Sequence, residues 1–343
     1  MGNKILVTGG TGFIGSHTVV ELYNAGYTPV IVDNLSNSSI KILDQIEKII
    51  GYKPEFHEFD LCDEAKTADF IKANPDIKGI IHFAAFKAVG ESVQKPLEYY
   101  RNNFFSLINL LTPYKGKDIN FVFSSSCTVY GQPDVLPVTE AAPVKKAESP
   151  YGNTKQIAEE ILSETAAVNK NYNIVALRYF NPVGAHETAL IGELPIGVPQ
   201  NLIPFVTQTA IGKREKITVF GDDYDTPDGS CIRDYIHVVD LAKAHVAAIK
   251  RMEEGRSVDN YEVFNIGTGK GTTVLEIINA FEKSTGEKLN YQIGPRRAGD
   301  IEKVYGDVTK SEQELGWKAE LNVDDMMKSA WEWEKYIGKS PFK

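Results

Sequence analysis

Short apolar runs alternate with segments of helical periodicity along the first 180 residues. We expect strands at residues 5–8, 30–33, 55–60, 79–83, 120–124 and 174–179, and helices at 13–23, 40–50, 65–73, 97–111 and 156–168. This alternation predicts an α/β fold with a doubly wound parallel sheet, because parallel neighbours need crossover connections. Ligands of such sheets bind at the carboxyl ends of the strands.

The alternation stops near residue 180, where a segment rich in proline and glycine follows (181–200). Beyond it, short strands (217–220 and 261–266) mix with helices at 202–211, 241–252, 274–281 and 323–333. We therefore expect two domains, a nucleotide-binding one at 1–180 and a smaller α/β substrate domain at 181–343. The alternative for residues 261–266 is that they return to the first sheet.

Length and composition narrow the class of protein. A chain of 343 residues with 42% hydrophobic and 24% charged residues is typical of a globular protein of about two domains. No apolar run approaches the roughly 18 residues of a membrane span, and Met1 to Lys4 lead directly into the first strand. We expect no membrane contact, no signal peptide and a cytoplasmic location. A net charge of −9 without a basic stripe argues against nucleic acid.

Cysteine and histidine give no pattern of a metal site. Cys62, Cys127 and Cys231 are odd in number and far apart, which is unlike a disulfide framework or a zinc site. The six histidines include no His-x-x-x-His pair. We expect no metal and assign the histidines a structural role.

Three glycines follow the first strand in the run Thr8-Gly9-Gly10-Thr11-Gly12-Phe13-Ile14-Gly15. Gly9 permits a tight turn, Gly12 lets a pyrophosphate approach the backbone, and Gly15 lets the helix lie close to the strand. The helix N-terminus offers free N–H groups to phosphates. The pattern predicts a Rossmann-type dinucleotide site, with an ordinary turn between strand and helix as the alternative.

An acid ends the second strand, in Val30-Ile31-Val32-Asp33. A carboxylate there binds the adenosine ribose hydroxyls and repels a 2′-phosphate, so NAD is favoured over NADP. The alternative is that Asp33 only caps its loop.

A tyrosine and a lysine lie four residues apart in Ser149-Pro150-Tyr151-Gly152-Asn153-Thr154-Lys155, after the serine cluster Ser124 to Ser126. On a helix they share one face. A positive charge about 5 Å from a phenol is worth roughly 3 kcal/mol at a dielectric near 20. With NAD⁺ bound, Tyr151 and Lys155 therefore predict a base that removes a hydroxyl proton while hydride leaves the same carbon, and Ser126 can hydrogen-bond that oxygen. The alternative is a surface tyrosine.

Several motifs occur together and in a fixed order along the chain. They are the glycine run, His82-Phe83-Ala84-Ala85, the serine cluster, Tyr151 with Lys155, Arg178 to Ala185, Gly197 to Leu202, Val219-Phe220-Gly221, Arg233 to Val238 and Pro295 to Asp300. The combination resembles the extended short-chain dehydrogenase/reductases and, within them, the UDP-glucose 4-epimerases. This resemblance implies inversion at C4 of a UDP-hexose through a 4-keto intermediate, interconverting UDP-galactose and UDP-glucose.

The resemblance also implies residue roles. The catalytic residues would be Tyr151, Lys155 and Ser126. The cofactor would contact Gly9, Gly12, Phe13, Ile14, Gly15, Asp33, Asn34, Asp60, Leu61, Phe83, Ala84, Lys87, Asn102, Ser124, Tyr151, Lys155 and Tyr179. The UDP-sugar would contact Ser126, Asn181, Asn201, Leu202, Val219, Phe220, Arg233, Tyr235, Arg297, Asp300 and Val304. From the residues alone, Arg233 could instead pair with Asp234 or Asp240, and Arg297 could be solvated.

Two departures refine the resemblance. Related dehydratases carry an Asp-Glu pair where this chain has Cys127 and Thr128, so water elimination lacks its acid. Epimerases restricted to unacetylated sugars carry a tyrosine where this chain has Val304, and the smaller valine predicts that UDP-N-acetylhexosamines also fit. If the correspondence is shifted by one residue, the adjacent Tyr305 would instead supply the bulky side of the sugar site.

The family implies a homodimer, with residues 97–111 and 156–168 as candidates for the interface. Alternatives are a dehydrogenase or an epimerase of another nucleotide sugar, and a dinucleotide sensor.

Overall fold

The computed structural model describes residues 2–297, 300–339 and 342. Seven parallel strands form its central sheet in the order β11-β6-β5-β4-β1-β2-β3. They span Tyr261–Ile266 (β11), Tyr172–Tyr179 (β6), Ile119–Ser126 (β5), Ile77–His82 (β4), Lys4–Thr8 (β1), Thr28–Asp33 (β2) and Glu55–Glu58 (β3). Residues 261–266 thus return to the first sheet, as one of the two alternatives expected.

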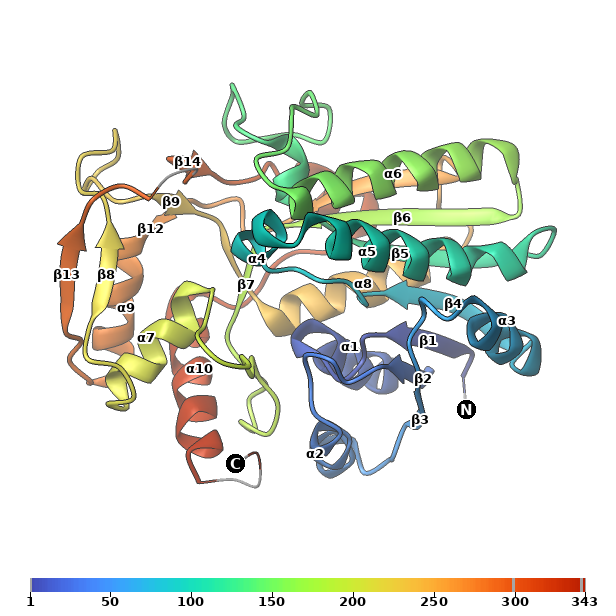
Figure 1. Cartoon of the computed structure of the whole chain (residues 1–343), viewed down its shortest axis with the longest axis horizontal. Helices are drawn as coiled ribbons and strands as arrows, with labels where there is room; N and C mark the ends of the chain where they lie inside the picture. Colours follow the sequence, from blue (N-terminus) through green and yellow to red (C-terminus); the bar gives the residue numbers. More distant parts are fainter. Residues whose placement is uncertain (1, 298–299, 340–341, 343) are drawn as a thin grey trace.

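Alternation along the strands builds a separate apolar core on each face of the sheet. Ile5 and Val7 face the core under α1 (Phe13–Asn24), α2 (Lys41–Ile50) and α8 (Val238–Glu253). Leu6 faces the opposite core under α3 (Glu64–Ala73), α5 (Pro96–Leu111) and α6 (Pro150–Val168). Because successive side chains point to opposite faces, these strands are apolar throughout and covered on both sides (Figure 1).

A smaller lobe lies beyond the carboxyl edge of the sheet (Figure 1). Its core joins α7 (Leu202–Ala210), α9 (Val274–Thr285) and α10 (Val323–Ile337) with residues of β8. Its strands pair in short sets: β8 (Ile217–Phe220) with β13 (Tyr291–Gly294), β7 (Asn181–Val183) with β10 (Tyr235–His237), and β9 (Ile232–Arg233) between β12 (Thr272–Thr273) and β14 (Lys303–Val304).

The order in which successive strands are added to the sheet reverses at β1, which pairs with β2 on one side and with β4 on the other. In a doubly wound sheet this is where a crevice opens at the carboxyl ends. A short helix, α4 (Val89–Gln94), lies beside this edge. Among the described residues, no helix combines the length and apolarity that crossing a membrane requires.

Candidate active site

A deep cavity of 1380 Å³ runs along the carboxyl edge of the sheet. Its wall joins the glycine loop at one end, Tyr151 and Lys155 in the middle, and Arg233 and Arg297 at the other end. One continuous cavity therefore brings together the dinucleotide, acid–base and anion-binding groups expected from the sequence.

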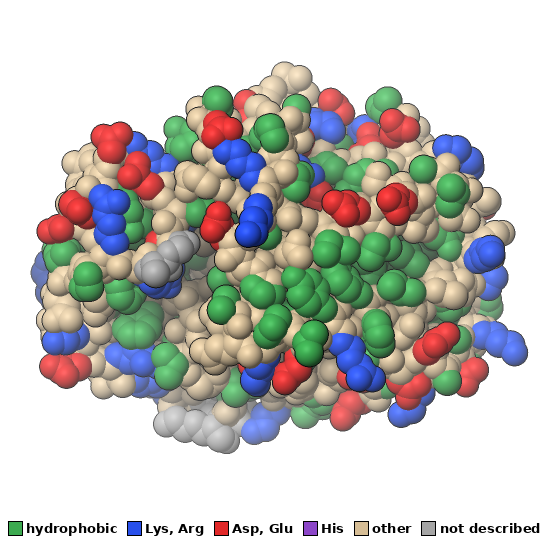
Figure 2. Space-filling view, turned by 45° about the horizontal axis from the view of Figure 1, so that its top comes forward, with side chains coloured by type: hydrophobic (Ala, Val, Ile, Leu, Met, Phe, Trp, Pro, Cys, Tyr) green, Lys and Arg blue, Asp and Glu red, His purple; other side chains and the backbone are tan. Residues whose placement is uncertain are grey.

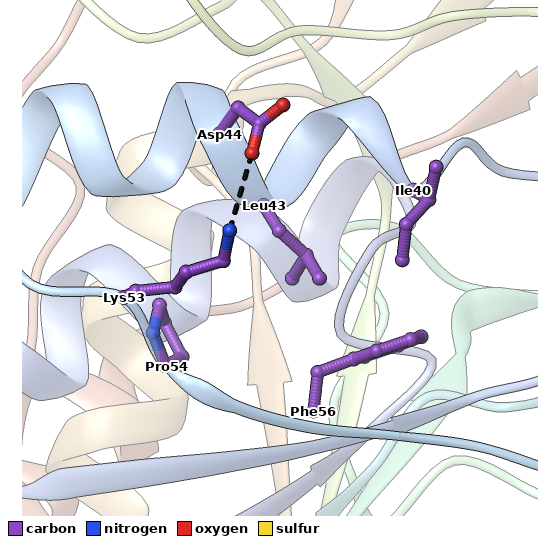
Figure 3. Close-up of a pocket in the computed structure, with 6 residues that line it drawn as sticks. All are labelled: Ile40, Leu43, Asp44, Lys53, Pro54 and Phe56. Carbon is purple, nitrogen blue, oxygen red and sulfur yellow. Dashed lines mark hydrogen bonds and ion pairs between the residues drawn. The ribbon is translucent and has the colours of Figure 1, made fainter.

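A second, more open hollow of 540 Å³ lies between α2 and β3. Figure 3 shows the Lys53 ammonium pointing toward Asp44, 3.5 Å from its carboxylate, with the apolar side chains of Leu43 and Phe56 nearby. No residue expected at the active site lines this hollow. We therefore assign the chemistry to the large cavity.

The glycine loop fits a dinucleotide pyrophosphate. Gly9 has a φ of +71°, and a Cβ on Gly15 would lie 2.2 Å from the Gly9 carbonyl oxygen, so neither position accepts another residue without rearrangement. Gly12 precedes α1, and no side chain caps the helix. The first-turn N–H groups are left for phosphate oxygens, as NAD would require.

Asp33 ends β2 at the cavity wall and is 7% exposed. Its carboxylate accepts hydrogen bonds from the Thr11 N–H (3.1 Å) and the Leu35 N–H (2.9 Å). The side chain thus braces the glycine loop and caps its own loop while lining the cavity. The two interpretations of Asp33 are compatible.

Helix α6 positions the tyrosine–lysine pair. The Ser149 hydroxyl accepts a hydrogen bond from the Gly152 N–H (3.1 Å), and Pro150 occupies the first helical position. The helix therefore begins at Pro150 and not near residue 156, so Tyr151 lies in its first turn. Lys155 follows one turn later on the same face.

Both side chains are buried, and burial acts on their pKa values in opposite directions. It raises the pKa of Tyr151 well above its ordinary value, while a hydrogen bond with Ser126 lowers it. Burial lowers the pKa of Lys155 to about 8, against the opposing charge of Glu159. The Lys155 ammonium donates a hydrogen bond to the Ser124 carbonyl oxygen (2.7 Å) and lies 5.9 Å from the centre of the Tyr151 ring.

Tyr179 lines the cavity close to the Tyr151–Lys155 pair. Its hydroxyl is 2.6 Å from the Ser124 hydroxyl, which fixes both side chains beside Lys155. All residues expected to contact the cofactor line the cavity: Gly9, Gly12, Phe13, Ile14, Gly15, Asp33, Asn34, Asp60, Leu61, Phe83, Ala84, Lys87, Asn102, Ser124, Tyr151, Lys155 and Tyr179.

Two arginines contact one carboxylate at the end of the cavity away from the glycine loop. Arg233 donates to Asp300 Oδ1 (2.7 Å) and Arg297 to the same oxygen (3.1 Å). Arg233 therefore pairs with Asp300 and with neither Asp234 nor Asp240. One carboxylate balances only one of the two guanidinium charges, which leaves a net positive end suited to a diphosphate.

Other residues expected at the UDP-sugar also line the cavity, namely Asn181, Asn201, Leu202, Phe220 and Tyr235. Val219 does not. It is 1% exposed in the core of the smaller lobe, because alternation along β8 turns its side chain away when Phe220 faces the cavity.

Ser126 and Val304 are likewise absent from the cavity wall in the described part of the chain. Ser126 lies behind Tyr151 with its hydroxyl accepting from the Thr128 N–H (3.3 Å). Val304 packs with Val138 and Phe180 in a separate apolar cluster, so its side chain forms no wall of the cavity. Tyr305 does not line the cavity either. Ala298 and Gly299 of the arginine motif lie outside the described residues.

Several polar residues of the wall were not predicted, among them Glu193 and Thr128. Glu193 accepts a hydrogen bond from Asn201 (2.6 Å) and forms an ion pair with Lys87 (3.7 Å), so it links the two sides of the cavity. The Thr128 hydroxyl is buried without a partner among the described residues. Glu193 lies in a proline- and glycine-rich loop without periodicity, and only its pairing in space reveals it.

Comparisons with known proteins agree with this geometry. Residues 6–330 match the family described as GDP-mannose 4,6 dehydratase. The chain is 49% identical over 335 residues to UDP-glucose 4-epimerase of Dictyostelium discoideum (97% of this chain, 96% of the relative). It is 46% identical to the human UDP-glucose 4-epimerase (98% and 97%).

Solved structures give the same result. The UDP-glucose 4-epimerase of Bifidobacterium longum in complex with NAD⁺ and UDP superposes with a TM-score of 0.91 at 49% identity (97% of this chain, 98% of that one). The enzyme of Stenotrophomonas maltophila, with bound NAD and formylated UDP-arabinopyranose, gives 0.94 at 44% (98% and 99%). The chain belongs to the UDP-glucose 4-epimerase family of short-chain dehydrogenase/reductases.

Proposed function

We propose that this protein interconverts UDP-galactose and UDP-glucose with NAD as its cofactor, inverting C4 through a 4-keto intermediate. The observation that carries this proposal is the single cavity that joins the glycine loop, the Tyr151–Lys155 pair and the Arg233–Arg297 pair. Relatives with bound NAD and UDP support the same assignment.

The chain's own residues supply the acid–base chemistry. The Tyr151 phenolate takes the proton from the C4 hydroxyl of the sugar, and the resulting Tyr151 hydroxyl later returns it. The Lys155 ammonium stabilises the tyrosinate through space, and Ser126 holds the phenol by a hydrogen bond. Bound NAD⁺ supplies the hydride acceptor at C4 and adds positive charge near Tyr151.

Inversion requires that the sugar present both faces of C4 in turn. The binding free energy should therefore come from the nucleotide, where Arg233 and Arg297 take the diphosphate and Phe220 lies near the uracil. A firm hold on UDP with few contacts to the hexose lets the keto sugar rotate without leaving.

Water elimination and net oxidation are the competing reactions. The positions beside Ser126 carry Cys127 and Thr128, neither of which is an acid suited to eliminate water. Proton NMR of the purified protein with UDP-galactose and no added cofactor tests the proposal. We expect UDP-glucose to appear with no net NADH, whereas accumulation of NADH with oxidised sugar would identify a dehydrogenase.

We further propose that UDP-N-acetylhexosamines are substrates. Support comes from the cavity wall, which includes neither Val304 nor Tyr305: Val304 packs in a separate apolar cluster, and the Tyr305 ring lies 3.1 Å from a Cβ built on Gly271, so no tyrosine at these two positions narrows the cavity. Turnover of UDP-N-acetylglucosamine tests this, and its absence under conditions that convert UDP-glucose would refute it.

We infer a homodimer formed by α5 and α6, located in the cytoplasm. Figure 2 shows apolar side chains gathered in a broad patch over α4 and α5. Val93, Leu97, Phe105 and Ile108 are exposed there, Leu97 by 81%. Sedimentation analysis should give twice the chain mass, and Leu97→Lys should shift the mass toward one chain. The three cysteines are free thiols, in keeping with a reducing compartment.

We also propose a division of labour between the two halves. Residues 1–180 bind NAD, with β11 and α8 only completing the sheet and the apolar core of that half, and the remainder of 181–343 binds the UDP-sugar. Support comes from the separate apolar core of the smaller lobe.

A further inference from the structure

A third buried residue follows Tyr151 and Lys155 on the same face of α6. Glu159 lies one further turn along the helix, is 6% exposed, and does not line the cavity. Residues four apart on a helix are neighbours. Glu159 therefore stands next to Lys155 on the side away from Tyr151, where the chemistry described so far gives it no role.

Each of these three helix residues is held by one serine at the end of β5. Ser126 hydrogen-bonds Tyr151, the Ser124 carbonyl oxygen accepts from Lys155, and the Ser125 hydroxyl donates to Glu159. The serine cluster thus fixes α6 against the sheet at three successive turns.

Arg178 completes the arrangement. It lies on β6 directly opposite Ser125, and its Nε donates to Glu159 Oε1 at 3.0 Å while Nη2 contacts the other oxygen. The Arg178 side chain is 7% exposed and that of Glu159 8%. Neighbouring side chains on the sheet fix this pair, so the carboxylate cannot turn toward solvent.

Burying an ion pair costs desolvation free energy, so stability alone does not explain why this pair lies next to Lys155. We propose that Glu159 is a positioning residue of the active site: anchored by Arg178 and Ser125, it keeps Lys155 protonated and in place beside Tyr151. The proposal rests on the function proposed above, because it deepens the role of Lys155 in that reaction.

Other titratable groups face this pair from every packed element. Tyr130 accepts a hydrogen bond from Arg178 (3.1 Å), and Glu140 contributes its carbonyl oxygen to Arg178 and its carboxylate to the Asn265 N–H. Tyr261 lies near Glu159, and its pKa is raised by burial. His82 faces Lys155, and burial lowers its pKa to about 3, so it stays neutral near pH 8. None of these groups replaces the negative charge of Glu159 beside Lys155.

Glu159→Gln tests the proposal because it removes the charge and keeps the shape. The remaining Arg178 cation then acts on Lys155 unopposed, so Lys155 should lose its proton at lower pH. We expect the alkaline limb of the kcat profile to move down by about one pH unit. In Glu159→Asp the limb should recover at least half of that shift but stay below the wild-type limb, since the charge returns one methylene farther away.

Glu262→Gln is the matched control. Glu262 forms an equally buried bidentate pair with Arg251 (2.8 Å for both bonds), with side chains 5% and 4% exposed, and neither residue lines the cavity. It should lose a comparable amount of thermal stability and keep the wild-type pH profile. An unshifted limb in Glu159→Gln, or an equal shift in Glu262→Gln, would overturn the proposal.

NMR of protein labelled with ¹³C at lysine Cε follows Lys155 without turnover, its signal assigned by its loss in Lys155→Met. The Lys155 pKa should fall in Glu159→Gln and stay unchanged in Glu262→Gln. If wild type has no epimerase activity but its Lys155 signal behaves as predicted, only the proposed function fails. Where Glu159→Gln does not fold, Glu159→Asp decides, and a wild-type Lys155 pKa in that variant would refute the positioning role.

Discussion

The Lys155 ammonium lies 5.9 Å from the centre of the Tyr151 ring, one helical turn further along α6, and is fixed there by the Ser124 carbonyl oxygen. At this distance it favours the ionised phenol by charge alone. Its own buried position makes that charge sensitive to pH. We therefore expect acid–base catalysis in this protein to depend on the charge state of Lys155 as well as on Tyr151.

Tyr151→Phe should lower kcat by about 10²- to 10⁴-fold, because it removes the group that we propose takes the C4 hydroxyl proton. UDP affinity, measured by calorimetry, should remain within a factor of about two, since the arginine end is untouched. Tyr27→Phe removes a hydroxyl that binds Glu253 far from the cavity and should keep full activity. Retained turnover in Tyr151→Phe would assign the base elsewhere.

The pH dependence of kcat should follow Lys155. Its pKa is lowered to about 8, so the ammonium is present below this pH and lost as pH rises through it. We expect kcat to decline above about pH 8. In Lys155→Arg the decline should move to higher pH, because a guanidinium stays charged. A kcat that stays flat to pH 9.5 in wild type would contradict this role.

Arg233→Met and Arg297→Met should each raise the KM for UDP-sugars about 10- to 100-fold. Each substitution removes one charged hydrogen-bonding group, which contributes about 1.5–3 kcal/mol to binding. Inhibition by UDP should weaken in parallel. Arg296→Met is the matched control, because Arg296 is exposed and paired with Asp223 (2.7 Å). An equal rise in KM for all three variants would indicate a general effect of charge.

Gly15→Ala should abolish retention of NAD, since the new Cβ would lie 2.2 Å from the Gly9 carbonyl oxygen and push α1 from β1. The measurement is the NAD content of purified protein after acid release. Gly338→Ala is the control, because a Cβ there meets its nearest atoms at 3.5 Å and φ is −60°. Normal NAD content in Gly15→Ala would refute the assignment of the loop.

Local pattern was enough to predict the sheet and the cofactor side of the site. Strand periodicity and the glycine spacing are properties of neighbouring residues, and they indicate the glycine loop and Asp33, whereas the other expected cofactor contacts come from the resemblance to the family. The apolar pattern placed this helix at residues 156–168, too late by about two turns, because the cap at Ser149 precedes the pattern; the placement of Tyr151 and Lys155 at the start of a helix is confirmed.

The UDP side depends on pairings between distant segments. Asp300 lies between Arg233 and Arg297 only because β14 pairs with β9, which the sequence does not indicate. Likewise the orientation of Val219 depends on which face of β8 packs on the smaller lobe's core.

The most direct test of the central claim uses UDP-galactose deuterated at C4 of the sugar. If C4 is oxidised and reduced within one closed site, the UDP-glucose formed should retain the deuterium at C4, with no label in water and none in added free NAD. Loss of the label to solvent would contradict oxidation and reduction of C4 within one site. Inversion that shows no deuterium isotope effect and cleaves the C4–O bond would contradict it too.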